Sequence, residues 1–384
     1  MDPGVTVEFS GLGLDVQGAL SALGTASEPI TLTSAATTPH AGDWYSLQFE
    51  AGSVGALSYT TISDAGSYCG GCGLTPNASV GVQGTVSLDH VTVTQSGYDG
   101  IAVAGSSNVS VTNSTVSGSG NSGLVVSDPS TPTISNSLFG DNGGRAIELS
   151  NPDSATNLAH NRFSGNGFDG VHLDGGMLTQ STTWPATSGP IELGGYITVG
   201  STTTLTIAAD ATIRGSNYSE LDVQGTLNAV GTANQPITFT SGLSPTNPGD
   251  WYGLQFEPGS FGHLSYTSVA YGGDAGCYSP TYYSSFCGAL YLSGAIATLD
   301  HVTVTHSSQG GILAIDGGRF SVSDSTLSNN GSYGIDLPDS NSSVPTSSIT
   351  GTHFLANGLD AVYLSNPDAM PSLANNIYNS SSLQ

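Results

Sequence analysis

LDVQGAL at residues 14–20 returns as LDVQGTL at residues 221–227, an offset of 207 residues. GDWY at residues 42–45 returns at residues 249–252 with the same offset. A duplication of this length, built on a shorter internal period, is typical of repeat architectures in which one unit stacks on the next. The sequence therefore predicts two tandem long repeats, residues 1–188 and 189–384, in one continuous solenoid.

The shorter period is about two dozen residues. Ile101, Leu124, Ile147 and Val171 each lie in a short apolar segment, and they are 23, 23 and 24 residues apart. Between them run β-branched alternations such as VTVT at residues 91–94, bounded by Gly, Asn and Asp, which are typical of strands and turns. A propeller blade needs about 40 residues, whereas a period near 23 matches one turn of a β-helix. The sequence thus predicts an all-β solenoid of parallel strands.

The turns of this solenoid carry a recurring Asn-Gly phrase. Asn142, Asn166, Asn330 and Asn357 each open it. Asn and Gly both tolerate positive φ, so we expect this phrase at the corners of the coil. Val, Ile and Leu should point inward, and the alternating Ser and Thr should face solvent.

Four segments of the second repeat carry a family resemblance: TLTI at 204–207, LDVQGTLNAVGT at 221–232, PITFTS at 236–241 and WYGLQF at 251–256. They resemble bacterial secreted right-handed parallel β-helix repeat proteins, whose fold is that of the pectin-lyase-like superfamily. The resemblance covers nearly the whole chain and implies a right-handed parallel β-helix in an extracellular or cell-surface protein. It does not single out one activity, because that superfamily includes lyases, hydrolases, epimerases, phage tailspikes, adhesins and modules without catalysis.

Basic residues are nearly absent. The chain has 4 Arg and no Lys against 29 acidic residues, and its formal net charge is −25. A negative field without a basic stripe repels phosphates, which argues against nucleic acid as a partner. No apolar run approaches the roughly 18 residues of a membrane span. The partners considered are a polysaccharide or a cell-surface molecule.

The two copies differ at their ends. The second copy is preceded by PIELGGYITV at residues 190–199, which the first copy lacks, and the first copy continues past its match to residues 365–368. Open solenoid ends expose strand edges that can pair with another chain. We therefore expect either a longer array or self-association through these ends.

Four cysteines follow equivalent strands in the two copies. Cys69 and Cys72 form a C-x-x-C, while Cys277 and Cys287 enclose nine residues. A redox pair needs a helix N-terminus to lower the thiol pKa, and a zinc site needs a second nearby pair. We predict two local disulfides, Cys69–Cys72 and Cys277–Cys287, each closing a loop that leaves the solenoid. Metal and redox roles are the alternatives.

The second of these loops is rich in aromatic residues. It contains Tyr278, Tyr282, Tyr283 and Phe286. Aromatic faces on a closed loop suit stacking on sugar rings or contact with a protein partner, so these four are the predicted binding residues. The alternative is that the rings cover the adjacent sheet.

An enzyme would depend on polar residues that occur in one copy only. The candidates are Glu148, Asp169, His172 and Asp174, because paired carboxylates can hydrolyse glycosides. The superfamily's polygalacturonases carry Asn-Thr-Asp, Asp-Asp, Gly-His-Gly and Arg-Ile-Lys sets, and none occurs here. Its lyases abstract a proton with Arg or Lys, which are scarce. The sequence therefore favours a chain without catalysis over a polysaccharide-acting enzyme.

Residues present in both copies favour a structural role, since one active site need not appear twice. These pairs are Trp44 and Trp251, Glu50 and Glu257, and His90 and His301. Calcium could bridge single-copy carboxylates, and no other cofactor is expected. The possible calcium ligands are Asp141, Asp153, Asp169 and Asp174, with solvated acidic corners as the alternative.

Three functional hypotheses follow. The first is a non-catalytic extracellular module of a secreted or cell-surface repeat protein, such as an adhesin, that binds a carbohydrate or another partner. The second is a carbohydrate-active enzyme, either a glycoside hydrolase or a protein like the polysaccharide lyases. The third is an extracellular filament subunit that stacks end to end.

Overall fold

The structure is a computed structural model that describes residues 1–67, 77–105, 107–127, 130–273, 287–338, 347–366 and 370–379. In these residues all regular structure is β-strand, apart from one 3-10 helix, η1 (Pro152–Ser154). Neighbouring strands pair in parallel, as between Leu14–Val16 and Leu47–Phe49. The predicted parallel β-helix is therefore confirmed. None of the described residues forms a helix of the length and hydrophobicity needed to cross a membrane.

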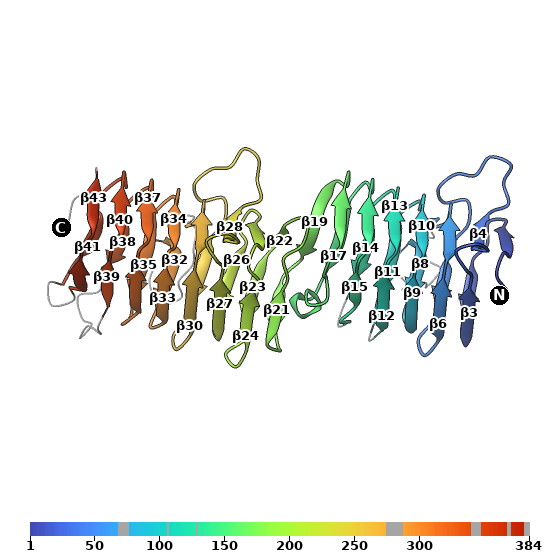
Figure 1. The fold of residues 1–384 in the computed structure, drawn as a ribbon, viewed down its shortest axis with the longest axis horizontal. Coiled ribbons are helices and arrows are strands. Elements are labelled where there is room, and N and C mark those ends of the chain that lie inside the picture. The colour runs from blue at the N-terminus through green and yellow to red at the C-terminus, as the bar shows by residue number, and fades with distance from the viewer. Residues whose placement is uncertain are drawn as a thin grey trace. The chain divides into compact units, whose positions relative to one another are not determined.

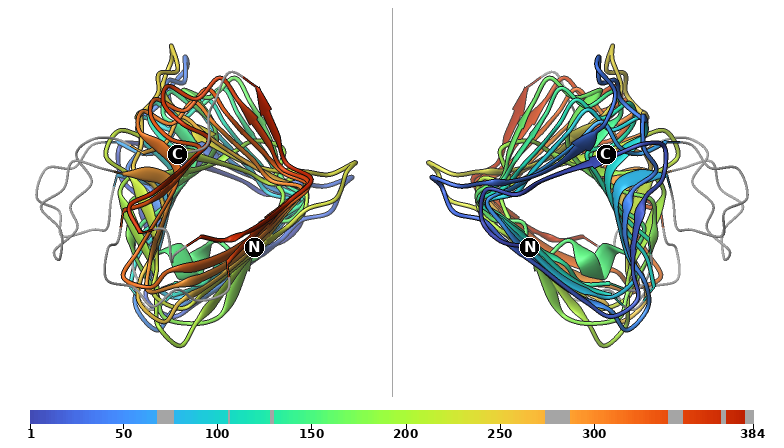
Figure 2. Two further views of the ribbon diagram at one scale, coloured as in Figure 1. Left: turned by 90° about the vertical axis from the view of Figure 1, so that its left-hand side faces the viewer. Right: turned by 90° about the vertical axis from the view of Figure 1, so that its right-hand side faces the viewer.

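The chain divides into two compact units, Met1–Asp174 with Thr187–Ile191, and Gly175–Ala186 with Glu192–Gln384. Strand β22 (Ile191–Leu193) contains the boundary. In each unit successive strands lie on three sides of a coil, as the end-on views of Figure 2 show, and Figure 1 labels the strands along it. Because parallel neighbours are one full turn apart in sequence, the 23-residue period fixes which strands pair.

The first unit has three ladders in its described part. Its first ladder is β1 (Thr6–Phe9), β4 (Ile30–Ser34), β7 (Thr60–Ser63), β10 (Thr92–Thr94), β13 (Thr115–Ser117), β16 (Leu138–Gly140) and β18 (Arg162–Ser164). The second, here called the β2–β19 sheet, is β2 (Leu14–Val16), β5 (Leu47–Phe49), β8 (Ala78–Val82), β11 (Asp99–Val103), β14 (Leu124–Val126), β17 (Arg145–Leu149) and β19 (Phe168–Leu173). The third is β3 (Ala19–Leu23), β6 (Val54–Ser58), β9 (Thr85–Asp89), β12 (Asn108–Thr112) and β15 (Thr133–Ser135).

The second unit repeats this plan. The β20–β41 sheet is β20 (Gly176–Leu178), β23 (Tyr196–Val199), β26 (Glu220–Val223), β29 (Gly253–Phe256), β32 (Gly288–Ser293), β35 (Gly310–Ile315), β38 (Ile335–Leu337) and β41 (Val362–Leu364). A second ladder is β21 (Thr182–Trp184), β24 (Thr204–Ile207), β27 (Thr226–Val230), β30 (Phe261–Ser265), β33 (Ile296–Asp300), β36 (Arg319–Ser323), β39 (Ser348–Thr350) and β42 (Ser372–Ala374). A third is β25 (Thr212–Gly215), β28 (Ile237–Ser241), β31 (Thr267–Ala270), β34 (Thr303–Thr305), β37 (Thr326–Ser328), β40 (His353–Leu355) and β43 (Ile377–Asn379).

Apolar columns run through the interior of each unit. In the β2–β19 sheet, register places Val16 beside Phe49 and Phe49 beside Val82, and all three side chains are buried. In the β20–β41 sheet, Val223 lies beside Phe256, which is again fully buried. Each such side chain contributes about 1.5–3 kcal/mol by leaving water. The alternating residues of the same strands then form the outer face of each sheet.

The Asn-Gly phrase does lie at the corners, but for a different reason from the one expected. Positive φ belongs to the residue before the Asn, as at Asp141 (52°) before Asn142. The Asn142 side chain points inward and links turns: its Nδ2 donates to Asn166 Oδ1 at 2.7 Å, and its Oδ1 accepts from Ser119 N at 3.0 Å. Asn330 makes the same bonds to its neighbouring turns in the second unit. These buried amides satisfy backbone groups that a tight corner leaves unpaired.

The twice-present aromatic residues have structural partners in both units. Trp44 Nε1 donates to Ser63 O at 2.8 Å, and Trp251 Nε1 donates to Ala270 O at 2.9 Å. Both indoles are buried. His90 stacks on Tyr59 with ring centroids 4.6 Å apart, and His301 makes the equivalent contact in the second copy. These contacts support the structural role predicted for the repeated Trp and His residues.

Cys287 is buried and disulfide-bonded. Its bonding partner lies outside the described residues, as do Cys69, Cys72 and Cys277. The two predicted pairings and the loops they would close therefore stay predictions. The same holds for a single solenoid running through both long repeats.

Candidate functional site

The residues proposed for an enzyme lie mainly on the outer face of the β2–β19 sheet. Glu148 of β17 is in register with His172 of β19. His172 Nε2 lies 3.4 Å from Asp174 Oδ1, and Arg145 Nη1 lies 3.2 Å from Glu148 Oε2. Glu148, His172 and Asp174 are thus brought together by adjacent strands.

Asp169, the fourth candidate, has a separate local role. Its carboxylate accepts hydrogen bonds from Asn166 N at 2.9 Å and Gly165 N at 3.1 Å. Burial acts to raise the pKa of Asp169, but these hydrogen bonds outweigh it and lower the pKa. Asp169 therefore stabilises the turn before β19 as a carboxylate.

The structure adds Asp99 to this face, a residue that sequence reasoning missed. Asp99 is 3% exposed, and burial raises its pKa to about 6, against hydrogen bonds from Asn121 and Ser122 and with the negative charge of Glu148 adding to the rise. Ser122 links the two acids: its N donates to Asp99 Oδ1 at 3.0 Å and its Oγ to Glu148 Oε2 at 3.3 Å. The sequence marked Asp99 only by its position: Asp99, Ser122 and Arg145 are 23 residues apart, so they occupy equivalent places on successive turns.

A denser carboxylate group lies on the outer face of the β20–β41 sheet. Glu220 and Asp222 point outward from β26, and Glu257 directly follows β29. Burial raises the pKa of Glu220 to about 7, and the negative charges of Asp222 and Glu257 add to the rise. Burial also raises the pKa of Asp222 and of Glu257. Burial therefore disfavours the charged form of all three acids, most strongly that of Glu220.

Asp222 is held in place by its neighbours. Its Oδ2 accepts from Gln224 Nε2 at 3.0 Å and from Thr198 Oγ1 at 3.3 Å. Register places Thr198 of β23 and Gln255 of β29 on either side of it. Within the described part of the chain, its buried Oδ1 has no hydrogen-bond partner. One oxygen of this carboxylate is therefore left without a hydrogen bond at a place that water does not reach, which disfavours its charged form.

Three tyrosines adjoin these acids. Tyr196 is in register with Glu220 on the neighbouring strand. Its ring lies 6.1 Å from that of Tyr252, and the ring of Tyr218 lies 6.2 Å from Tyr252. Tyr252 is 8% exposed, whereas Tyr196 and Tyr218 are 55% and 57% exposed. We call this group the carboxylate–tyrosine face, made of Tyr196, Thr198, Tyr218, Glu220, Asp222, Tyr252, Gln255 and Glu257.

Tyr218 adopts an unfavourable backbone conformation. Its φ is 62°, in the left-handed region that costs a non-glycine residue about 1–2 kcal/mol. More than half of its side chain is exposed, so packing recovers little of that cost. Corner residues with structural partners, such as Tyr59 and His90, also have positive φ, so this conformation is a general feature of the corners of the coil.

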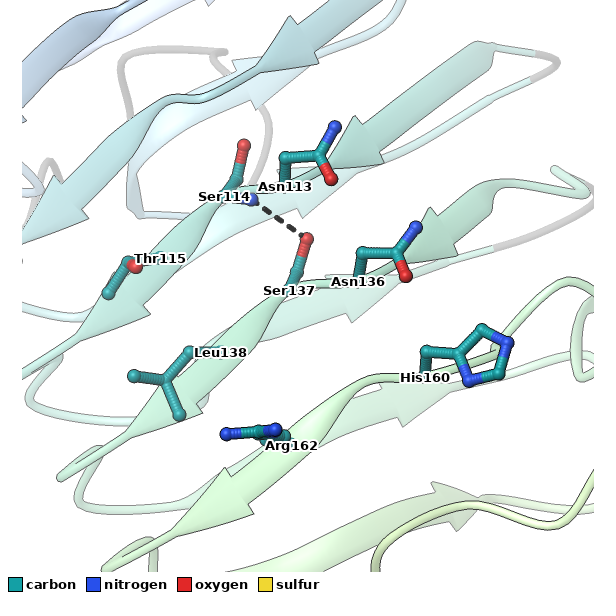
Figure 3. A pocket seen from close by; sticks show the side chains of 8 residues that line it. All are labelled: Asn113, Ser114, Thr115, Asn136, Ser137, Leu138, His160 and Arg162. Carbon is teal, nitrogen blue, oxygen red and sulfur yellow. Dashed lines mark hydrogen bonds between the residues drawn. The ribbon is translucent and has the colours of Figure 1, made fainter.

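The first unit also has a pocket of about 540 Å³ at a corner of the coil. Figure 3 shows Asn113, Asn136 and His160 extending on one side of the corner and Arg162 on the other. Ser114 N donates to Ser137 Oγ at 3.1 Å in its floor. The remaining lining residues are Thr115 and Leu138. Its polar and basic lining contrasts with the acidic, aromatic carboxylate–tyrosine face.

The possible calcium ligands occupy different settings. Asp153 is buried in η1, Asp141 is exposed at a corner, and Asp174 is paired with His172. Among the described residues, one group of at least three His, Cys or carboxylate ligands gathers within 4.8 Å, and it is Asp300, His301 and Asp324. Calcium at the four predicted aspartates stays a prediction.

The predicted binding loop lies outside the part of the chain that the structure describes. Tyr278, Tyr282, Tyr283 and Phe286 all lie outside the described residues. Their role as binding residues stays a prediction. Tyr196 and Tyr218 are described, exposed and next to acids, and the sequence alone did not single them out.

The chain belongs to the right-handed β-helix family, whose model matches residues 40–181 and 261–383. A model of the pectate-lyase-like β-helix domain matches residues 176–275. No curated protein matches the sequence.

Solved structures with a similar arrangement include the PL6 family alginate lyase AlyGC, at 11% identity and a TM-score of 0.25, covering 100% of this chain and 87% of the lyase. A point mutant of that lyase matches similarly, at 11% identity and a TM-score of 0.25 over 99% and 87% of the two chains. The catalytic domain of a GH87 α-1,3-glucanase has 12% identity and a TM-score of 0.24 over 96% and 64%. Similarity at this level does not bear on function.

Proposed function

We propose that this chain is an extracellular β-helical protein that binds a polysaccharide on the carboxylate–tyrosine face. The observation that carries this proposal is the placement of exposed Tyr196 and Tyr218 beside Glu220, Asp222 and Glu257. Tyrosine rings stack on the apolar faces of sugar rings with little loss of side-chain freedom. Carboxylates accept strong, charge-assisted hydrogen bonds from sugar hydroxyls. The two kinds of group together match the chemistry of a glycan.

The charge of this face restricts the ligand. The three acids repel anionic sugars, and the whole chain carries a formal net charge of −25. Neutral or cationic glycans are therefore expected to bind more tightly than polyuronates or sulfated polymers. Tyr196 of β23 and Glu220 of β26 lie in register on neighbouring strands, so successive sugars can contact successive strands of this face.

A second candidate function is glycoside hydrolysis at the same face. The specific observation in its favour is the pKa of Glu220, raised by burial and by its acidic neighbours to about 7. A protonated Glu220 could donate its proton to the glycosidic oxygen, while the Asp222 or Glu257 carboxylate activates water or attacks the anomeric carbon. Environments that push the pKa values of neighbouring acids apart are typical of such acid and base pairs.

A polysaccharide panel tests both functions. Purified chain is assayed for binding by isothermal titration calorimetry and for product by reducing-sugar release. The test variant is Asp222→Asn, and the matched control is Asp15→Asn, the same change at the equivalent position of the first copy. The proposed function is supported if the chain binds a glycan without releasing product and if Asp222→Asn weakens this binding while Asp15→Asn does not. Product release that is lost in Glu220→Gln would establish the hydrolase instead, and absence of binding to any glycan would reject both.

A further inference from the structure

A buried, unpaired carboxylate lies farther along the same sheet. Asp336 of β38 is 6% exposed, and in the described part of the chain its Oδ1 has no hydrogen-bond partner. An unpaired carboxylate away from water costs several kcal/mol. The equivalent residue of the first copy, 211 positions earlier, is the apolar Val125. The fold therefore does not require an acid at this position.

Aromatic and apolar side chains surround Asp336. Register places it between Leu313 of β35 and Tyr363 of β41. The ring of Tyr363 stacks on Tyr333 with centroids 4.7 Å apart. Leu313 belongs to a buried apolar cluster with Tyr291 and Ile315, and all three are at least 94% buried. These described neighbours do not supply the six to eight oxygen ligands that calcium takes.

Nothing positively charged in the described residues neutralises Asp336. The chain has no lysine, and no described arginine is paired with this carboxylate. The negative charges of Asp336 and Asp360 both act on Tyr333, so more than one acid contributes to the local field. Burial raises the pKa of Asp336 to about 6, which is the response expected of a carboxyl group without a cation.

We propose that Asp336, Tyr333 and Tyr363 form a subsite for the protonated amine of an amino sugar, so that the bound polysaccharide carries free ammonium groups. An ammonium supplies hydrogen-bond donors and positive charge to Asp336. The tyrosine faces attract the same cation through their π electrons. The inference rests on the proposed function and names the class of its ligand. A lysine side chain of a protein partner has the same ammonium group, but the polysaccharide-binding face on the same sheet favours the sugar.

Calorimetry with two matched oligosaccharides tests this subsite. The probes are a glucosamine hexamer, whose amines can be protonated, and an N-acetylglucosamine hexamer, whose nitrogens are neutral amides. Wild-type chain is expected to bind the glucosamine hexamer about tenfold more tightly, which corresponds to about 1.4 kcal/mol. Asp336→Asn is expected to remove that preference. Asp336→Val, which introduces the residue of the first copy, should do the same in a well-packed chain.

The control variant is Asp210→Asn, because Asp210 is exposed in the same unit, has a φ of 70° that Asn tolerates, and gives the same change in net charge. It is expected to retain the preference. Equal binding of the two hexamers, or a preference that survives in Asp336→Asn, overturns the subsite while leaving the proposed function intact if Asp222→Asn still weakens binding. Poly-lysine is added as a competitor. If its binding depends on Asp336 as strongly as the binding of the glucosamine hexamer does, the assignment to a glycan is overturned.

Discussion

The two copies share three polar residues on their outer faces. Asp15, Gln48 and Glu50 of the first copy return as Asp222, Gln255 and Glu257. Even the local bond is the same, since Gln17 Nε2 donates to Asp15 Oδ2 at 3.0 Å and Gln224 Nε2 donates to Asp222 Oδ2 at 3.0 Å. The surroundings nevertheless differ: Asp15 is exposed, whereas Asp222 is partly buried.

The difference comes from residues that were not duplicated. Gly11 and Gly13 of the first copy are replaced by Tyr218 and Glu220 in the second. A side chain at Gly13 would place its Cβ 2.6 Å from Ser46 O, so the first copy cannot accept the glutamate without backbone movement. Tyr196 of β23, the strand paired with β26, adds a further ring to this face. Duplication reproduced the framework, and the added groups make the candidate site.

The largest expected effect concerns the shared framework. Trp44→Ala and Trp251→Ala each remove a fully buried indole and its hydrogen bond. Each should lower the free energy of unfolding by about 3–5 kcal/mol, measured by urea denaturation. Trp44→Ala should leave glycan affinity unchanged. A loss below about 1 kcal/mol at either position would show that the two copies do not share their packing.

Next in size is the effect of replacing Tyr218 by the glycine of the first copy. Tyr218→Gly should weaken glycan binding about tenfold by calorimetry, because a stacking ring is lost. Stability should not fall, since glycine adopts a φ of 62° without strain. Tyr59→Gly is the contrasting control: Tyr59 stacks on His90, so this variant should lose stability but not affinity. If the Tyr218→Gly variant is less stable and still binds the glycan with unchanged affinity, Tyr218 is a structural residue.

A smaller effect should appear as a pH dependence of stability. Burial and the neighbouring acids raise the pKa of Glu220 from 4.5 to about 7 in the folded chain. The stability linked to this group is therefore fully present below about pH 4.5 and is lost as the pH rises through 7. Glu220→Gln should remove that loss, on the order of 2 kcal/mol after allowance for solvent screening. If the melting temperatures of wild type and variant change in the same way from pH 4 to pH 8, Glu220 does not cause this loss of stability.

The smallest expected effect is in the first unit. Arg145→Ala breaks a partly exposed ion pair with Glu148 and should cost about 1 kcal/mol or less. Glycan affinity should not change. If affinity or product release were lost instead, the site would lie on the β2–β19 sheet, and the hypothesis of an enzyme built on Glu148, His172 and Asp174 would gain support.

Much of the fold could be predicted from the sequence because parallel neighbours repeat at one period. Ile101 and Leu124, which are 23 residues apart in the sequence, lie side by side in register on adjacent strands. The carboxylate–tyrosine face did not follow from that period. Asp222 and Glu257 are 35 residues apart, since the turn between them contains an insertion after β28, so spacing alone did not bring them together. Glu257 was also expected to be structural because it recurs as Glu50, although a recurring residue can join a site through neighbours that do not recur.

Carboxyl footprinting tests the central claim most directly. The chain is labelled with a carbodiimide and an amine, with and without the tightest ligand from the polysaccharide panel, and modification is quantified by mass spectrometry. Bound ligand should reduce labelling of Glu220, Asp222 and Glu257 while Asp15 and Glu50 remain unchanged. Protection of the first-copy acids instead, or unchanged labelling of all five with ligand bound, would contradict the assignment of the site to the second copy.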